Sequence, residues 1–149
     1  MCFQLYAATT KPLPRRKWEL DSSRLPVRPL NARDATVKVH FSNPEVQFIG
    51  STSGCGCDFP NLIFQNGGWP YDEDREVEPE EAASDRLNCE GLVSLLRSTG
   101  DSIVELYGIW DGHFAEAPKA FETIPVGAIL NEGFRFKERG FYRVRMMPD

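Results

Sequence analysis

The sequence has 149 residues, of which 41% are hydrophobic and 26% are charged, a composition typical of one globular domain spanning residues 1–149. A formal net charge of −5 argues against binding to nucleic acid, because nucleic-acid-binding proteins usually carry an excess of basic residues. No apolar run approaches the roughly 18 residues of a membrane span, and the first ten residues lack a signal-peptide pattern, so we expect a cytoplasmic protein without a membrane partner.

In the first half of the chain, three segments alternate apolar and polar residues as β-strands do. They are residues 2–9, 35–41 and 46–50, and the dipeptide Asn43-Pro44 would join the last two as a hairpin. Between the first and second segments, residues 11–33 are basic and rich in proline. This stretch predicts a loop that contains a short extended piece near residues 25–30.

An acidic segment at residues 66–83 separates this half from a predicted helix. It carries seven carboxylates against a single arginine, a pattern typical of a mobile, solvated loop. A docking surface for a basic protein partner and a weak divalent-cation site are the alternatives. The helix should begin at Ser84 or Asp85 and end near Gly100, which would take a left-handed conformation. Its apolar face is expected to comprise Leu87, Leu92, Val93, Leu95 and Leu96.

The C-terminal third predicts mainly strands. Residues 102–110 alternate strongly and end at the turn dipeptide Asp111-Gly112. A short helical turn, interrupted by Pro118, is expected over 115–121, whereas 124–130 is apolar without a clear type. Residues 134–146 alternate around Gly140 and predict a β-hairpin. With six or seven strands and one main helix, we expect an α+β fold in which the helix packs on a mostly antiparallel sheet.

The candidate chemistry is concentrated in the motif Gly54-Cys55-Gly56-Cys57, which follows an apolar strand. Two thiols one residue apart can bind the same metal ion, and zinc is the metal that such ligands favour. Cys2, Cys89, His40 or His113 could complete the ligand set. The same thiols could instead perform redox chemistry, or they could be buried side chains in a structural turn.

Cys2 is a second candidate, because removal of Met1 would leave an α-amine beside its thiol, as in enzymes with an N-terminal cysteine nucleophile. We expect the first strand to pair beside residues 46–50, which would bring Cys2 within several ångströms of Cys55 and Cys57. This predicted cluster is the proposed metal site. Cys89, which lies between apolar helix positions, is expected in the core.

Three further residues are weaker candidates for the site. Asp58 directly follows the cysteine motif, and His113 follows a predicted strand end. Trp69, with its neighbours Pro70 and Tyr71, would offer an exposed aromatic contact.

The chain as a whole resembles a group of small uncharacterised bacterial proteins. The resemblance rests on Met1-Cys2, on Gly50-Ser51 with Gly54-Cys55-Gly56-Cys57-Asp58-Phe59, and on the segment from Glu105 to Gly112. It implies no established activity. The sequence therefore favours a small binding or interaction module, with a protein partner or a small ligand, whose cysteine loop holds a metal ion. A thiol-dependent enzyme that uses Cys55, Cys57 or Cys2 is the alternative.

Overall fold

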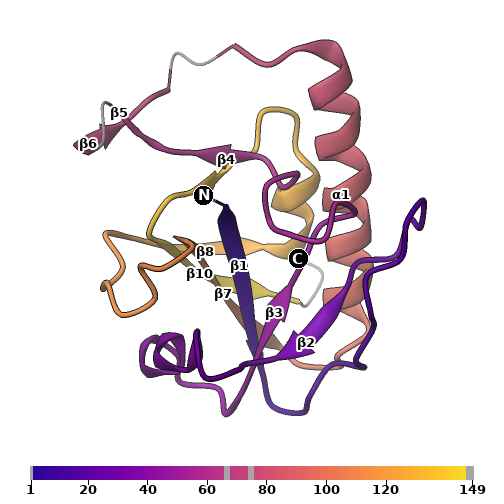
Figure 1. The fold of residues 1–149 in the computed structure, drawn as a ribbon, viewed down its shortest axis with the longest axis vertical. Coiled ribbons are helices and arrows are strands. Elements are labelled where there is room, and N and C mark those ends of the chain that lie inside the picture. Colours follow the sequence, from indigo (N-terminus) through magenta and orange to yellow (C-terminus); the bar gives the residue numbers. More distant parts are fainter. Residues whose placement is uncertain (1, 66–67, 74–75, 147–149) are drawn as a thin grey trace.

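The structure is a computed structural model that describes residues 2–65, 68–73 and 76–146, with the backbone alone at 65 and 68–70. Its central six-stranded sheet has the order β2–β3–β1–β7–β10–β8 (Figure 1). All neighbouring strands are antiparallel except β10 and β8, which run parallel. The strands are β1 (Phe3–Thr9), β2 (Val27–Pro29), β3 (Glu45–Ile49), β7 (Ile103–Trp110), β8 (Ala120–Pro125) and β10 (Gly140–Arg145).

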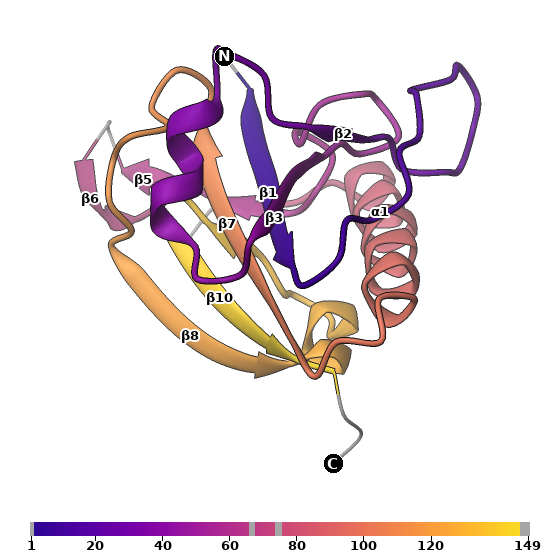
Figure 2. The same ribbon diagram turned by 90° about the horizontal axis from the view of Figure 1, so that it is seen from below.

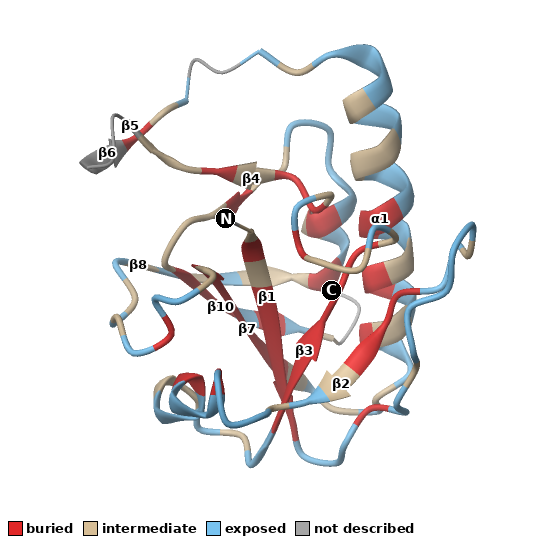
Figure 3. Ribbon diagram, viewed as in Figure 1, coloured by how far each residue is buried: buried red, intermediate tan, exposed pale blue. Residues whose placement is uncertain are grey.

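Helices cover both faces of this sheet (Figure 2). The long helix α1 (Pro79–Arg97) and the 3₁₀ helix η2 (Val126–Leu130) lie on one face, and the 3₁₀ helix η1 (Ala35–His40) lies on the other. Alternate residues of β1 point to opposite faces, so Phe3 and Leu5 join the core under α1 while Tyr6 joins the core under η1. β1 is therefore buried on both sides, as Figure 3 shows.

Two small sheets complete the fold. β4 (Asn61–Leu62) pairs in parallel with β9 (Phe136–Lys137), and β5 (Phe64–Gln65) pairs with β6 (Gly68–Tyr71). One main helix and a mostly antiparallel sheet confirm the predicted α+β class. Within the described ranges, no helix combines the length and the apolar character needed to cross a membrane.

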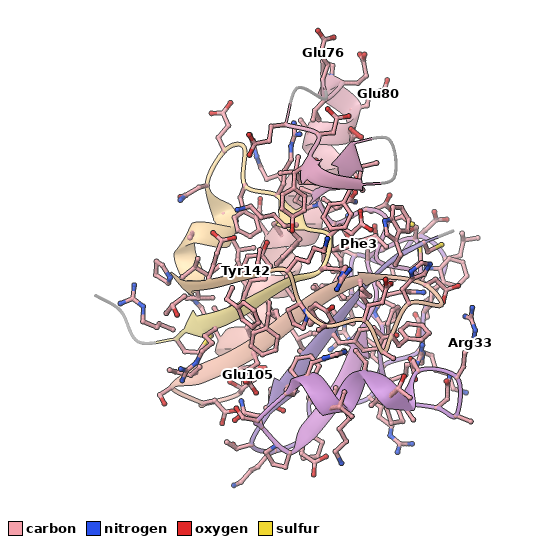
Figure 4. The ribbon with its side chains drawn as sticks, turned by 90° about the vertical axis from the view of Figure 1, so that its left-hand side faces the viewer. Phe3, Arg33, Glu76, Glu80, Glu105 and Tyr142 are labelled. Carbon is pink, nitrogen blue, oxygen red and sulfur yellow. The ribbon has the colours of Figure 1, made fainter. Side chains whose placement is uncertain are left out.

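The helix begins earlier than the sequence pattern predicts. Pro79 occupies its first turn, where a missing N–H costs nothing, and the carboxylates of Glu80 and Glu81 favour the positive end of the helix dipole. Figure 4 shows Glu76 and Glu80 pointing outward at this end of the molecule. The assignment of residues 66–83 to a loop is thus wrong for residues 79–83 and for β6. Leu87, placed on the apolar face by its spacing, is 51% exposed.

The predicted hairpin of residues 35–41 with residues 46–50 is wrong, because residues 35–40 form η1. Only Val37 of this segment is buried, while Val39 is 77% exposed. The buried carboxylate of Glu105 accepts hydrogen bonds from the amides of Ser42 (3.0 Å) and Asn43 (2.7 Å), which fixes the chain where it leaves η1. β3 therefore pairs with β1 and β2 instead.

The predicted hairpin at residues 134–146 is also wrong. Both edges of β10 are occupied, by β7 and by β8, so β9 has no free edge there and pairs with β4. The predicted helical turn over residues 115–121 does not form, because β8 begins at Ala120. The amides of Lys119 and Ala120 instead donate to the carbonyl of Arg139.

Candidate metal centre

Three of the four cysteines meet at one point. The Sγ atoms of Cys2, Cys55 and Cys57 all lie within 4.8 Å of one another. Cys2 directly precedes β1, and the other two lie in the loop of residues 50–60 that follows β3 (Figure 1). The predicted proximity of Cys2 to the cysteine motif is therefore confirmed, and the predicted pairing of β1 with β3 accounts for it.

Gly56 allows the loop to approach β1 this closely. A Cβ atom at Gly56 would lie 2.4 Å from the carbonyl oxygen of Phe3 and 3.2 Å from the Cα of Gln4, so only glycine fits between the two backbones. Gly54 adopts a φ of +99°, which L-residues rarely adopt. The two glycines of the motif therefore shape the bend and press Cys55 and Cys57 against the start of β1.

Hydrogen bonds hold the loop in this shape. The amide of Ser51 donates to the Cys55 carbonyl at 2.6 Å, and the amide of Phe59 donates to the Gly56 carbonyl at 3.1 Å. Phe59 itself is fully buried in the core. Asn88, buried on α1, accepts a hydrogen bond of 2.8 Å from the Thr52 amide. A hydrogen bond to α1 thus also anchors the loop.

Cys2 is held by the end of β7. The amide of Asp111 donates to the Cys2 carbonyl at 2.8 Å. The Asp111 carboxylate pairs with the guanidinium of Arg33 at 2.7 Å, and the hydrogen bond from Arg33 lowers the pKa of Asp111. The backbone of Cys2 is therefore tied to the sheet and to the segment that leads into η1.

The thiols of Cys55 and Cys57 differ in acidity. Burial opposes ionisation of Cys55, but hydrogen bonds from the Cys57 amide, the Cys57 thiol, the Ser53 hydroxyl and the Cys2 thiol outweigh it and lower the Cys55 pKa. Burial, followed by the hydrogen bonds to Cys55 and Cys2, raises the pKa of Cys57 to about 12. Thiolates at Cys55 and Cys57 would repel one another, so a bound cation would favour ionisation of both.

The donor set suits a soft cation. Zinc bound tetrahedrally at about 2.3 Å from sulfur requires ligand sulfurs roughly 3.8 Å apart, which lies inside the 4.8 Å limit of this cluster. Thiolates also bind Cu(I) and iron–sulfur clusters, whereas Mg²⁺ and Ca²⁺ prefer oxygen. The three cysteines would leave a fourth position of a tetrahedral zinc free for another donor.

The other predicted ligands lie elsewhere. Cys89 is buried in the core on α1, as expected. His40 Nε2 contacts the Phe114 carbonyl at 2.9 Å, and His113 Nδ1 pairs with the Glu116 carboxylate. Within the described residues, neither these residues nor Asp58 joins the sulfur cluster.

The aromatic contact predicted at Trp69 and its neighbour Tyr71 can be assessed only at Tyr71. Tyr71 is buried and donates to the Glu138 carbonyl at 2.7 Å, which contradicts an exposed role. The side chain of Trp69 lies outside the described residues. Sequence reasoning missed Ser53, whose Oγ lies 3.7 Å from the Cys55 Sγ, although its position two residues before Cys55 was visible. It also missed Asn88, a polar residue within the apolar part of a helix.

Comparison with known proteins adds no assignment. Neither a protein-family model nor a curated protein nor a solved structure shows significant similarity to this chain.

Proposed function

We propose that this protein is a small binding module that holds one zinc ion through Cys2, Cys55 and Cys57. The observation that supports this most strongly is the convergence of three sulfur atoms from two distant chain segments within 4.8 Å. Gly56, where any side chain would strike the backbone of β1, supports it as well, because a loop with no need to approach β1 could accept other residues there.

In this proposal the protein supplies three thiolates, and the fourth position accepts water, a small ligand or a donor from a partner protein. A structural zinc site usually has four protein ligands, whereas a site with three leaves one position for exchange. A module of this kind would bind its partner or ligand through the metal. Since thiolates must lose their protons to bind, zinc affinity should fall as the pH is lowered.

A zinc titration of the reduced protein, with a chromophoric chelator as competitor, tests the proposal. We expect about one equivalent of zinc per chain. Cys2→Ser, Cys55→Ser and Cys57→Ser should each weaken binding by at least about tenfold, since each removes one of three ligands. Cys89→Ala is the matched control and should bind zinc as the unmodified chain does, because Cys89 lies in the core away from the cluster. No binding, or equal loss in the control, would contradict the proposal.

A thiol-dependent enzyme is the second candidate, favoured by the environment of Cys55. Its Sγ accepts a hydrogen bond from the Cys57 amide at 3.5 Å and has two further thiols within reach. The reaction would be reduction of a hydroperoxide. The Cys55 thiolate attacks the hydroperoxide and takes one oxygen to become a sulfenic acid, and the leaving alkoxide is protonated to an alcohol. The Cys57 or Cys2 thiol then displaces water and forms a disulfide, which a second dithiol must reduce.

The two candidates make different predictions for the metal-free protein. The redox candidate requires that hydrogen peroxide convert the reduced chain into a single intramolecular disulfide among these cysteines, faster than it oxidises the Cys55→Ser variant. If peroxide reacts with both proteins at the rate of a free thiol, the redox candidate fails while the zinc proposal stands.

A further inference from the structure

A cavity of about 540 Å³ lies beside the cysteine loop, where the chain after β1 runs along β2. Its lining includes the cations Arg15, Arg16 and Lys17, the aromatic rings of Trp18 and Phe48, and Gly54 of the cysteine loop. Cavities of roughly 300–1,000 Å³ are the size that proteins use for small ligands. The cavity is therefore large enough for one small molecule. Gly54, one of its lining residues, directly precedes Cys55.

Hydrogen bonds hold the walls of this cavity in place. Arg16 and Val27 exchange backbone hydrogen bonds of 3.0 and 2.9 Å, which attaches the cationic segment to the edge of the sheet. Trp18 donates from Nε1 to the Thr52 carbonyl at 2.8 Å, yet the residue remains 47% exposed. An indole with its N–H already bonded and much of its surface open is suited to stack against a planar ring.

The charge of the cavity is largely uncompensated. Arg28, which also lines the cavity, forms an ion pair with Asp34 at 3.0 Å and lies over the Phe48 ring at 4.4 Å. In contrast, within the part of the chain that the structure describes, no carboxylate forms an ion pair with Arg15, Arg16 or Lys17. Three cationic residues thus line one cavity of a chain whose net charge is −5.

We infer that this cavity binds a nucleoside monophosphate, with the phosphate held by Arg15, Arg16 and Lys17 and the base stacked on Trp18. Arginine and lysine are the side chains that recognise phosphate, and bases stack readily on exposed aromatic rings. Single-stranded nucleic acid offers the same chemistry. A free mononucleotide is favoured because the negative net charge opposes approach of a long polyanion. The inference does not rest on the proposed zinc site.

Isothermal titration of the full chain with AMP, adenosine, inorganic phosphate and a short single-stranded oligonucleotide tests the inference. AMP should bind at least about tenfold more tightly than either adenosine or phosphate, because only AMP uses both the cations and the indole. The triple variant Arg15→Gln/Arg16→Gln/Lys17→Gln should weaken AMP binding by at least about tenfold. Trp18→Leu should reduce AMP affinity to that of phosphate alone.

Arg24→Gln and Lys11→Gln are the matched controls, since they remove positive charge from the same basic segment but do not line the cavity. They should leave AMP affinity unchanged. Equal affinity for AMP and phosphate, no binding of AMP, or equal weakening by the controls would overturn the inference. Much tighter binding of the oligonucleotide than of AMP would overturn the assignment to a mononucleotide.

Discussion

The substitution Gly56→Ala should separate the cysteine loop from β1. Its Cβ would lie 2.4 Å from the Phe3 carbonyl oxygen, where real contacts are essentially never below 3.0 Å, so the two backbones must move apart by at least about 0.6 Å. Overpacking of this kind costs about 1–3 kcal/mol. For a chain of this length, that loss lowers the melting temperature of the metal-free protein by roughly 2–12 °C.

The same movement should damage the sulfur cluster. A metal site tolerates deviations of only about 0.2 Å in its ligand distances, so a shift of about 0.6 Å should weaken zinc binding by at least about tenfold. The assay pairs thermal unfolding of the metal-free protein with zinc competition. Gly127→Ala is the control, because a Cβ at Gly127 meets nothing within 4 Å. If Gly56→Ala matched the unmodified chain in both measurements, a glycine at position 56 would not be what allows the loop to approach β1.

Three further predictions concern thiols and the loop anchor. In metal-free protein near neutral pH, Cys55→Ser should abolish the fast phase of alkylation, whereas Cys57→Ser should retain it. The lowered pKa of Cys55 keeps its thiolate present at lower pH, whereas the Cys57 thiol stays protonated up to a pKa of about 12. Loss of the fast phase in both variants would contradict this. Asn88→Ala should cost about 1–3 kcal/mol in urea unfolding by leaving the Thr52 amide without its partner, and an unchanged urea midpoint would contradict this anchoring role. Burial raises the Cys89 pKa to about 12 from 9.0, so its contribution to stability is complete below pH 9 and is lost as the pH rises toward 12. Between pH 9 and 12, the free energy of unfolding of Cys89→Ala should therefore fall less steeply than that of the unmodified chain, by up to about 1.4 kcal/mol per pH unit. Parallel plots of the free energy of unfolding against pH for the two proteins would argue against this burial effect.

The parts of the fold that follow from local periodicity were predictable. β3 alternates apolar and polar residues, β1 and β7 are rich in the aromatic and apolar residues that favour strands, and α1 carries buried residues near the helical repeat. The alternation in residues 35–40 was misleading because η1 buries only Val37 and exposes Val39. Which segment pairs with β3 depends on contacts between distant residues, and the local pattern does not encode those contacts.

The cysteine cluster was predictable from one correct pairing, that of β1 with β3. The sequence also displays the glycines of the motif, but it does not show that the Phe3 carbonyl lies against Gly56. The hydrogen bond from Trp18 to Thr52 spans 34 residues and has no local signature. The loop anchors and the basic cavity therefore emerge only from the three-dimensional arrangement.

X-ray absorption at the zinc edge, on reduced protein loaded with one equivalent of zinc, tests the proposed site most directly. The proposal predicts three sulfur neighbours at about 2.3 Å and one lighter neighbour, nitrogen or oxygen, in the fourth position. A shell composed of nitrogen and oxygen alone, or one with a single sulfur, would contradict a zinc site built from Cys2, Cys55 and Cys57.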